Sequence, residues 1–388
     1  MKKDVIIIGA GAAGLMCAIR AGKRRRSVLV LEHTKRIGNK IRVSGGGNCN
    51  FTNTNPDHEH YFSHNPHFCR SALSRFTPHD FIGMLGRHGI AYHEKERGQL
   101  FCTEGSASIT NMLRKECNEA GVEILLNCRI RSLRKENGFV FSTDQGTFGS
   151  ESLVVATGGL SYPELGATDM GYRIARQFGL RLVPTRPALV PLTFNPGDMA
   201  FFRELSGISV DATASAGKMN FPGSILFTHR GLSGPAILQV SSCWNQGEPI
   251  RLDLFPDKDI FGLFMAQRQS RMEMRNFLSL HLPRRLAYKW CEVHVPSKPL
   301  CRFSEKELKE TAERLHSWEV TPRGTEGYKK AEVTLGGIDT DGLSSKTMEA
   351  KKVPGLYFAG EVIDVTGQLG GYNLHWAWAS GHAAGQHV

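Results

Sequence analysis

The chain has 388 residues, and at about 150 residues per domain this length predicts two to three domains. Hydrophobic residues make up 40% and charged residues 22%, which excludes the disordered class, and no apolar run approaches the roughly 18 residues of a membrane span. The 48 Lys and Arg against 37 Asp and Glu give a formal net charge of +11, an excess that attracts phosphates and other anions without identifying a function.

The cysteines and the N-terminus indicate a cellular compartment. Nine cysteines occur, none of them paired at CxxC spacing, which argues against a zinc ribbon, an iron–sulfur site or a redox dithiol. The histidines form no cluster typical of a metal site, so we expect no metal. Met1-Lys2-Lys3 before Val5–Ile8 faintly imitates a signal peptide, but Asp4 and the following glycines interrupt it. We expect a cytoplasmic protein with reduced thiols.

The first 32 residues predict a compact βαβ unit. Asp4–Ile8 is a β-branched strand, Leu15–Ala21 a helix and Ser27–Leu31 a second buried strand. Between the first strand and the helix lies Gly9-x-Gly11-x-x-Gly14, and Glu32 follows the second strand. A lone glycine motif of this kind is a weak signal, but this position between strand and helix is typical of a dinucleotide site.

Each residue of that motif has its own physical reason. Gly9 permits the tight turn, Gly11 lets the backbone approach a pyrophosphate, and Gly14 lets helix and strand pack closely. The pyrophosphate would lie at the helix N-terminus, where free N–H groups favour negative charge. Glu32 would accept hydrogen bonds from ribose hydroxyls and disfavour a 2′-phosphate, so the motif predicts FAD or NAD rather than NADP.

The rest of the first half alternates loop, helix and strand. Gly38–Asn53 is a Gly- and Asn-rich loop, and Pro66–Gly121 is mainly helical, with extended interruptions near Tyr92 and at Leu100–Cys102. A small meander of four short strands is expected at Glu123–Leu126, Ile130–Arg134, Phe139–Thr143 and Thr147–Phe148. A separate apolar strand, Leu153–Ala156, leads into Thr157-Gly158-Gly159.

The predicted secondary structure changes in the second half of the chain. After Pro184, strands dominate to about Leu254 and helices return from Pro256 to Leu315, where Ser304 and Glu307 have capping-box spacing. A strand at Glu332–Leu335 and a closing helix at Leu374–Gly385 follow. We therefore expect a dinucleotide-binding domain in two parts, 1–187 and 333–388, and an inserted domain, 188–332, with a helical segment at about 256–316.

Several segments resemble known flavoproteins. Val155–Gly159 and Gly355–Glu361 resemble the FAD cradle of the two-dinucleotide-binding-domain flavoproteins, and the run Thr334–Ile338 with later motifs is similar to the fumarate reductase and aspartate oxidase group. More specifically, Lys40–Asn53, Leu226–Ala236 and Gly360–Asn373 resemble the BaiN/YhiN-type flavoproteins, a resemblance that extends over the whole chain.

This resemblance implies an α/β fold with a discontinuous Rossmann-like FAD-binding domain (1–187 and 333–388) and an inserted, mixed β-barrel-like domain (188–332) that caps the substrate. Two positions depart from the family pattern: Asn48 stands where Arg is frequent, and His375 stands where Gln is usual. The glycine motif and the resemblance together assign FAD to Gly9, Gly11, Ala12, Ala13, Gly14, Glu32, Lys40, Ser44, Gly45, Gly46, Ile130, Thr157, Gly158, Gly360, Glu361, Asp364, Gly371, Tyr372, Asn373 and Leu374.

The last helix and one loop carry the weak catalytic candidates. The Gly370-Gly371 turn precedes a helix whose backbone N–H groups would stabilise negative charge on reduced flavin. His229 and Arg230 would supply a proton or orient an acidic substrate if the inserted domain caps the flavin, and Tyr372 would act as an acid or a stacking partner. For all three, a structural role in a turn or in packing is the competing interpretation.

The main functional expectation is an FAD-dependent oxidoreductase that reduces an activated, enone-type C=C bond of a small organic substrate, with NAD(P)H as a transient donor. An FAD-dependent oxidase of a small amine is the first alternative. A flavoprotein that binds or modifies RNA is another, motivated by the net charge and by 16 basic against 11 acidic residues between Arg251 and Lys330. A structural or redox-sensing FAD is a third. The main expectation includes neither a membrane nor a nucleic-acid partner and leaves the oligomeric state open.

Overall fold

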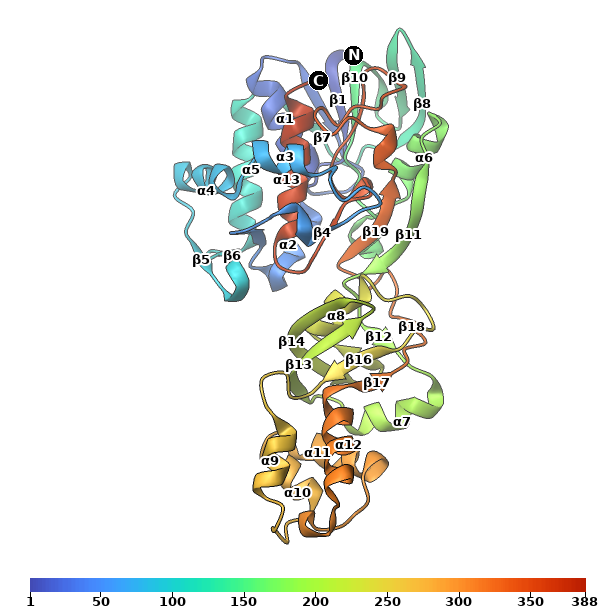
Figure 1. The fold of residues 1–388 in the computed structure, drawn as a ribbon. Helices are drawn as coiled ribbons and strands as arrows, with labels where there is room; N and C mark the ends of the chain where they lie inside the picture. Colours follow the sequence, from blue (N-terminus) through green and yellow to red (C-terminus); the bar gives the residue numbers. More distant parts are fainter. The chain divides into compact units, whose positions relative to one another are not determined.

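The computed structural model describes all 388 residues and divides into two compact units (Figure 1). Unit 1 comprises Met1–Pro187 and Glu332–Val388, and unit 2 comprises Ala188–Ala331. Both chain termini lie in unit 1 (Figure 1). None of the helices combines the length and apolar character that crossing a bilayer requires.

A parallel sheet forms the centre of unit 1. Its strands β7 (Glu123–Leu125), β2 (Val28–Leu31), β1 (Lys2–Ile8), β10 (Gly146–Val155) and β20 (Leu356–Phe358) are neighbours in this order. All four side chains of β2 and the last four of β1 are buried, as expected for strands covered on both faces. Helix α1 (Ala12–Lys23) connects β1 with β2 and packs against both.

The expected meander differs from the observed one. Strand β9 (Gly138–Thr143) pairs antiparallel with β10, and β8 (Ile130–Glu136) pairs antiparallel with β9, whereas β7 lies beside β2 at the opposite edge. Two strands expected separately, Thr147–Phe148 and Leu153–Ala156, fall on the single strand β10, which ends at Val155. Its serines do not interrupt it because residues from Gly149 to Val155 stay in register with β1.

The remaining elements of unit 1 surround this sheet. Its helices are α2 (Asn39–Val43), α3 (Arg70–Arg75), α4 (Pro78–Arg87), α5 (Ser106–Glu119), α6 (Met170–Gln177) and α13 (Tyr372–Gly385). In one short sheet β6 (Gln99–Cys102) lies between β3 (Asn50–Asn53) and β5 (Tyr92–Glu94). Two more short sheets pair β4 (Tyr61–Phe62) with β21 (Thr366–Gly367) and β11 (Leu182–Ala188) with β19 (Val333–Ile338).

Helices α1 and α13 approach each other closely (Figure 1). A Cβ atom at Gly381 would lie 2.3 Å from the carbonyl oxygen of Ala13, and one at Gly385 would lie 2.6 Å from that of Cys17. Trp376 and Trp378 of α13 are 1% and 0% exposed and pack into the core. The C-terminal helix is therefore fixed against the helix that follows the first glycine motif.

Unit 2 is built on an antiparallel sheet. Its order is β17 (Trp318–Val320), β16 (Ile250–Asp253), β13 (Ser209–Ala216), β14 (Met219–Thr228), β15 (Gly231–Ser233), β12 (Leu192–Thr193) and β18 (Gly324–Thr325). The end strands β17 and β18 are not paired with each other, so the barrel-like domain expected from the sequence is an open sheet in its hydrogen bonding.

The helices of unit 2 are α7 (Pro196–Glu204), α8 (Pro235–Ser241), α9 (Ile260–Ala266), α10 (Met274–Leu278), α11 (Arg284–His294) and α12 (Glu305–His316). Within this unit α9 to α12 gather together (Figure 1). The capping box expected for α12 is present, because Ser304 N donates to Glu307 Oε2 at 2.7 Å and Glu307 N donates to Ser304 Oγ.

The close approach of α1 and α13 gives a stability prediction. Gly381→Ala places a methyl group against the backbone of α1 and should lower the free energy of unfolding by about 1 to 3 kcal/mol. The matched control is Gly83→Ala in α4, where the nearest atom to the added Cβ lies 4.0 Å away; it should raise stability by about 0.5 to 1 kcal/mol through helix propensity. Urea unfolding followed by circular dichroism measures both, and equal effects would contradict the role assigned to Gly381.

Candidate functional site

The first glycine motif forms the turn between β1 and α1. A Cβ atom at Gly9, which has φ +106°, would lie 2.4 Å from Ala156 O, and one at Gly14 would lie 1.9 Å from Gly9 O. Gly11 is different, because a Cβ there would meet no atom within 4 Å. No side chain caps the N-terminus of α1. The turn thus leaves open space beside backbone N–H groups, as a bound pyrophosphate requires.

Glu32 stands at the end of β2 and is 8% exposed. Its Oε2 accepts a hydrogen bond from Ala10 N at 2.9 Å, and its Oε1 accepts one from Thr34 N at 2.8 Å. Its main-chain oxygen accepts from Cys128 N at 2.9 Å, which brings the segment leading to Ile130 to the same strand end. Because a carboxylate has about four acceptor positions, Glu32 retains capacity for ribose hydroxyls.

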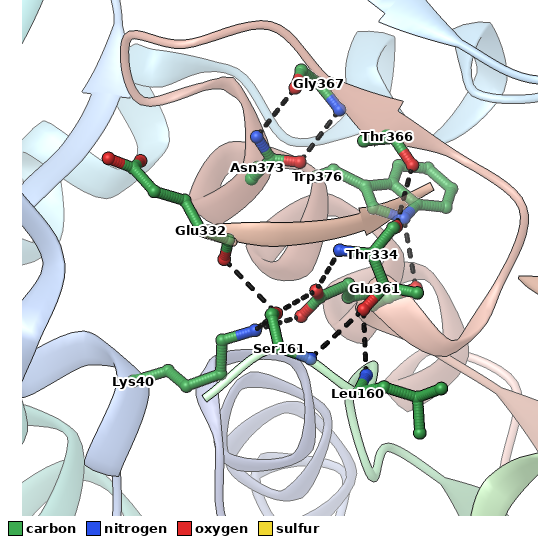
Figure 2. A network of polar contacts seen from close by, with 11 residues as sticks. Lys40, Leu160, Ser161, Glu332, Thr334, Glu361, Thr366, Gly367, Asn373 and Trp376 are labelled. Atoms are coloured by element: carbon green, nitrogen blue, oxygen red, sulfur yellow. Dashed lines mark hydrogen bonds and ion pairs between the residues drawn. The ribbon is translucent and has the colours of Figure 1, made fainter. Parts of the chain in front are cut away.

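Four segments far apart in the sequence meet around Glu361 (Figure 2). Lys40 Nζ donates to Glu361 Oε2 at 2.6 Å and to Ser161 Oγ at 2.8 Å. The other carboxylate oxygen, Oε1, accepts from Thr334 N at 2.9 Å and from Ser161 Oγ at 3.1 Å. These contacts join helix α2, the turn after β10, strand β19 and the turn after β20.

Ser161 and Thr334 are site residues that the sequence analysis missed. Thr334 Oγ1 accepts from Leu160 N at 2.8 Å, and the Cβ of a residue at 159 in place of Gly159 would lie 2.5 Å from that oxygen. Two features of the sequence could have pointed to these residues: Thr334 begins the Thr334–Ile338 run, and Ser161 lies only two residues after Gly159. Neither signal indicated that the Ser161 hydroxyl and the Thr334 backbone N–H both donate to Glu361.

The turn after β10 leaves one hydroxyl group without a partner. Thr157 Oγ1 is buried and makes no hydrogen bond. At the next residue, Gly158, φ is +73° and an added Cβ would lie 3.8 Å from Glu361 Oε2. An unpaired buried hydroxyl and a glycine beside a paired carboxylate fit a cradle that accepts a polar ligand.

The N-terminus of α13 is shaped by Asn373. Asn373 Oδ1 accepts from Gly367 N at 2.8 Å, and its Nδ2 donates to Gly367 O at 2.8 Å (Figure 2). Gly371 has φ +95°, and a Cβ there would lie 2.3 Å from Thr52 O. No side chain caps α13. The amide of Asn373 therefore holds a loop, and the helix offers backbone N–H groups, including that of Leu374, to a ligand.

Two further predicted residues are buried near this helix. Tyr372 is 7% exposed, its ring centroid lies 4.6 Å from that of His60, and burial raises the pKa of its hydroxyl. Asp364 Oδ2 accepts from His64 N at 2.8 Å, and burial raises the pKa of this carboxyl group. At present Tyr372 contributes to packing, and its part in chemistry stays a prediction.

The Gly-rich loop after α2 turns through left-handed conformations. Gly45 and Gly46 have φ of +56° and +66°, and Ser44 Oγ donates to Ile41 O at 2.8 Å. A Cβ at Gly46 would meet nothing within 4 Å, whereas one at Gly45 would lie 2.7 Å from the ring of Phe101. Asn48, one of the two departures from the family pattern, is exposed.

The other departure, His375, is fully buried. Its Nδ1 lies 2.8 Å from Thr52 Oγ1, and its Nε2 has no hydrogen-bond partner. Burial lowers the pKa of this imidazole to about 4, so the ring is neutral in the folded protein at neutral pH.

Unit 1 contains every predicted cofactor residue, including Gly360 and the first-turn residues Ala12 and Ala13. The predicted catalytic residues His229 and Arg230 lie in unit 2, in the exposed turn between β14 and β15. Arg230 Nη1 lies 3.3 Å from Glu326 Oε2. Their structural role in the turn is thus visible, and their catalytic role stays a prediction.

Comparisons with known proteins give consistent matches over nearly the whole chain. The family model described as HI0933-like protein Rossmann domain matches residues 3–387. The chain is 49% identical to the ribosomal RNA dihydrouridine synthase of Escherichia coli (strain K12), covering 99% of this chain and 97% of that protein. It is 47% identical to the protein of the same name from Haemophilus influenzae, covering 97% and 96%.

A solved structure supports the fold alone. The 3-ketosteroid-delta4-(5alpha)-dehydrogenase of Rhodococcus jostii RHA1 is similar with a TM-score of 0.53 and 16% identity, covering 99% of this chain and 96% of that one. The α/β class with a Rossmann-like domain, expected from the sequence, is confirmed by the family match and this likeness.

The open space at Gly11 predicts a separation of folding from ligand binding. Gly11→Ala should leave the unfolding temperature of the ligand-free protein unchanged, because the methyl group meets no protein atom. It should weaken dinucleotide binding at least about tenfold, because the methyl group occupies the space that the pyrophosphate needs. Flavin content of the purified protein and titration with FAD measure this. Gly197→Ala, equally unhindered in α7 of unit 2, is the control. Unchanged flavin affinity in Gly11→Ala would contradict the assignment.

The burial of His375 predicts an acid-sensitive fold. Since its pKa is about 4 when folded and near 6.5 when unfolded, the unfolded chain binds the proton more readily, and stability falls as the pH drops from about 6.5 to 4. On acidification from pH 7.5 to pH 4, the wild type should lose up to about 3 kcal/mol more free energy of unfolding than His375→Gln loses. Urea unfolding across this range measures it, with exposed His79→Gln as control. Parallel pH profiles for wild type and His375→Gln would refute the prediction.

Proposed function

Because the chain belongs to the HI0933-like protein family, we propose that it is an FAD-dependent dihydrouridine synthase that acts on ribosomal RNA. The observation that carries this proposal is its near-full-length similarity, at almost half identity, to two proteins that bear this name. The fold and the cradle in unit 1 support the flavin, and the net charge of +11 supports a polyanionic substrate.

The main expectation from the sequence was wrong about the substrate. It named a small organic molecule and set nucleic acid aside, whereas the relatives that share almost half of the residues are named for action on ribosomal RNA. The alternative of an RNA-modifying flavoprotein, raised by the positive charge, is the better-supported one. The expected enzyme class, a flavin-dependent oxidoreductase, is confirmed by the family and by these relatives.

The residues of unit 1 fit a flavin dinucleotide. The open space at Gly11 and the uncapped N-terminus of α1 suit the pyrophosphate, and Glu32 suits the adenosine ribose. The paired carboxylate Glu361, with Lys40 beside it, suits the hydroxyl groups of the ribityl chain. The uncapped N-terminus of α13 supplies N–H groups that would stabilise negative charge on the ring system.

The reaction converts the C5=C6 bond of a uracil base, which is conjugated with the C4 carbonyl, into a single bond. Bound flavin in its reduced form supplies the hydride for C6. The protein must deliver a proton to C5. Tyr372 remains the candidate acid in unit 1, because its hydroxyl carries a proton at neutral pH and burial raises its pKa further. In unit 2, His229 remains a candidate acid, and Arg230, whose guanidinium keeps its proton, remains a candidate for orienting the substrate.

The RNA substrate imposes two requirements beyond flavin chemistry. A base inside a folded RNA must leave its stack before its C5=C6 bond can meet a flavin, so the enzyme must bind an extruded or unpaired uridine. Phosphates flank that uridine on both sides, and Lys and Arg side chains must neutralise them. We keep NAD(P)H as the proposed electron donor and the cytoplasm as the proposed location.

Formation of dihydrouridine tests the function directly. The flavin-loaded protein, reduced anaerobically with NADPH or dithionite, should form dihydrouridine in ribosomal RNA transcribed in vitro, as measured by mass spectrometry of the digested nucleosides. Free uridine should react far more slowly, because it lacks the flanking phosphates. The flavin-depleted protein is the control. Dihydrouridine no higher than in this control, at full flavin occupancy, would overturn the proposal.

A further inference from the structure

The helical part of unit 2 has an uneven charge. Between Ile260 and Arg302, which includes α9, α10 and α11, the sequence holds eight Lys and Arg but only two Asp and Glu. The neighbouring helix α12 (Glu305–His316) instead carries four Glu against three Lys and Arg. The positive charge of this region is therefore concentrated on α10 and α11 and the segments that flank them.

Two arginines on these helices share one aromatic ring. The guanidinium carbon of Arg275 in α10 lies 5.2 Å from the ring centroid of Tyr288 in α11, and that of Arg284 lies 5.1 Å from it. The Tyr288 hydroxyl donates to Asn276 Oδ1 at 2.5 Å, which fixes the ring. Both arginines are exposed. The ring holds two cations near each other at the surface.

Nearby carboxylates neutralise only part of this charge. Arg275 Nε lies 2.7 Å from Glu273 Oε2, so one carboxylate faces this guanidinium through Nε. Arg284 forms no ion pair, and the adjacent Arg285 contacts a main-chain oxygen, that of Glu204, rather than a carboxylate. Like charges held this close repel one another, and an anionic partner would relieve the repulsion.

The chemistry of this cluster suits phosphate groups. A guanidinium presents a planar set of N–H donors that matches phosphate oxygens, and stacking on an aromatic ring preserves its outer edge for such contacts. Two guanidiniums that share one ring would contact successive phosphates of a single strand more readily than an isolated anion. RNA, with its regular phosphates and its unstacked bases, is the partner that this combination favours.

We propose that the arginine face of unit 2, defined as Arg275, Arg284, Arg285 and Tyr288, docks the phosphate backbone of the RNA substrate. This inference rests on the proposed function and deepens it, because it names the surface that holds the RNA. The face acts in binding and not in the redox step. Its loss should therefore raise KM for RNA and leave kcat unchanged.

The test compares two double variants that remove the same charge. Arg275→Ala with Arg284→Ala removes two cations from the arginine face, and Lys306→Ala with Lys309→Ala removes two from the acidic helix α12. Affinity for ribosomal RNA transcribed in vitro is measured from 50 to 200 mM salt by filter binding with flavin-loaded protein. The arginine variant should bind about tenfold more weakly, and the slope of log affinity against log salt should fall by about 1.5. The lysine variant should stay within about twofold of wild type.

Tyr288 provides a second, independent comparison. Tyr288→Phe keeps the ring and should bind RNA like the wild type. Tyr288→Leu removes the ring that holds both guanidiniums, and its RNA affinity should fall by about half as many log units as that of the double arginine variant. Unfolding temperature and flavin absorbance, measured for every variant, show that the protein remains folded.

The outcomes separate this inference from the proposed function. If the arginine variant binds RNA with the affinity and salt slope of the lysine variant, the arginine face is not the docking surface, even where dihydrouridine forms normally. Should wild type bind RNA through this face but form no dihydrouridine, the proposed function fails and the docking surface stands. A rise in KM for RNA at constant kcat, confined to the arginine and Tyr288→Leu variants, supports both.

Discussion

The backbone contact between α1 and α13 is the constraint on which the candidate site depends. The glycines at 381 and 385 let the last helix lie directly against the carbonyl groups of Ala13 and Cys17. One helix starts at the first glycine motif, and the other starts at the Gly370-Gly371 turn. Their contact therefore brings two uncapped N-termini from opposite ends of the chain into one unit. A bulkier residue at position 381 or 385 would push α13 away from α1, and the two helix N-termini would then move apart although no polar residue of the site had been replaced.

A second constraint is electrostatic and concerns Glu361. Its carboxylate is mostly withdrawn from water, and a nearby cation and several hydrogen-bond donors replace the lost hydration. Lys40 supplies the cation, and Ser161 and the Thr334 backbone supply the donors. These partners come from segments that contribute nothing to the central parallel sheet. The carboxylate thus aligns the loops at the ends of the strands, whereas the glycine contacts align the helices.

Prediction from the sequence was most accurate for features that depend on residues close together in the chain. The glycine motif, the strands beside it and the capping box at Ser304 follow from spacing alone. Prediction failed where the reason is tertiary. Nothing in Thr147–Ala156 indicates that pairing with β1 makes it one strand, and nothing near Asn373 indicates that its amide holds Gly367. Ser161 and Thr334 were missed because their partner, Glu361, lies at least 27 residues away in the sequence.

The substrate was misjudged for a related reason. A flavin cradle determines which kind of bond is reduced, and uracil offers a C=C bond conjugated with a carbonyl group, as an enone does. The size and charge of the molecule that carries this bond are determined elsewhere, by surfaces that need not touch the flavin. Net charge alone does not locate such a surface, because most of the Lys and Arg residues are scattered or lie beside Asp and Glu. Only the folded positions of Arg275, Arg284 and Tyr288 show that part of this charge is gathered around one ring.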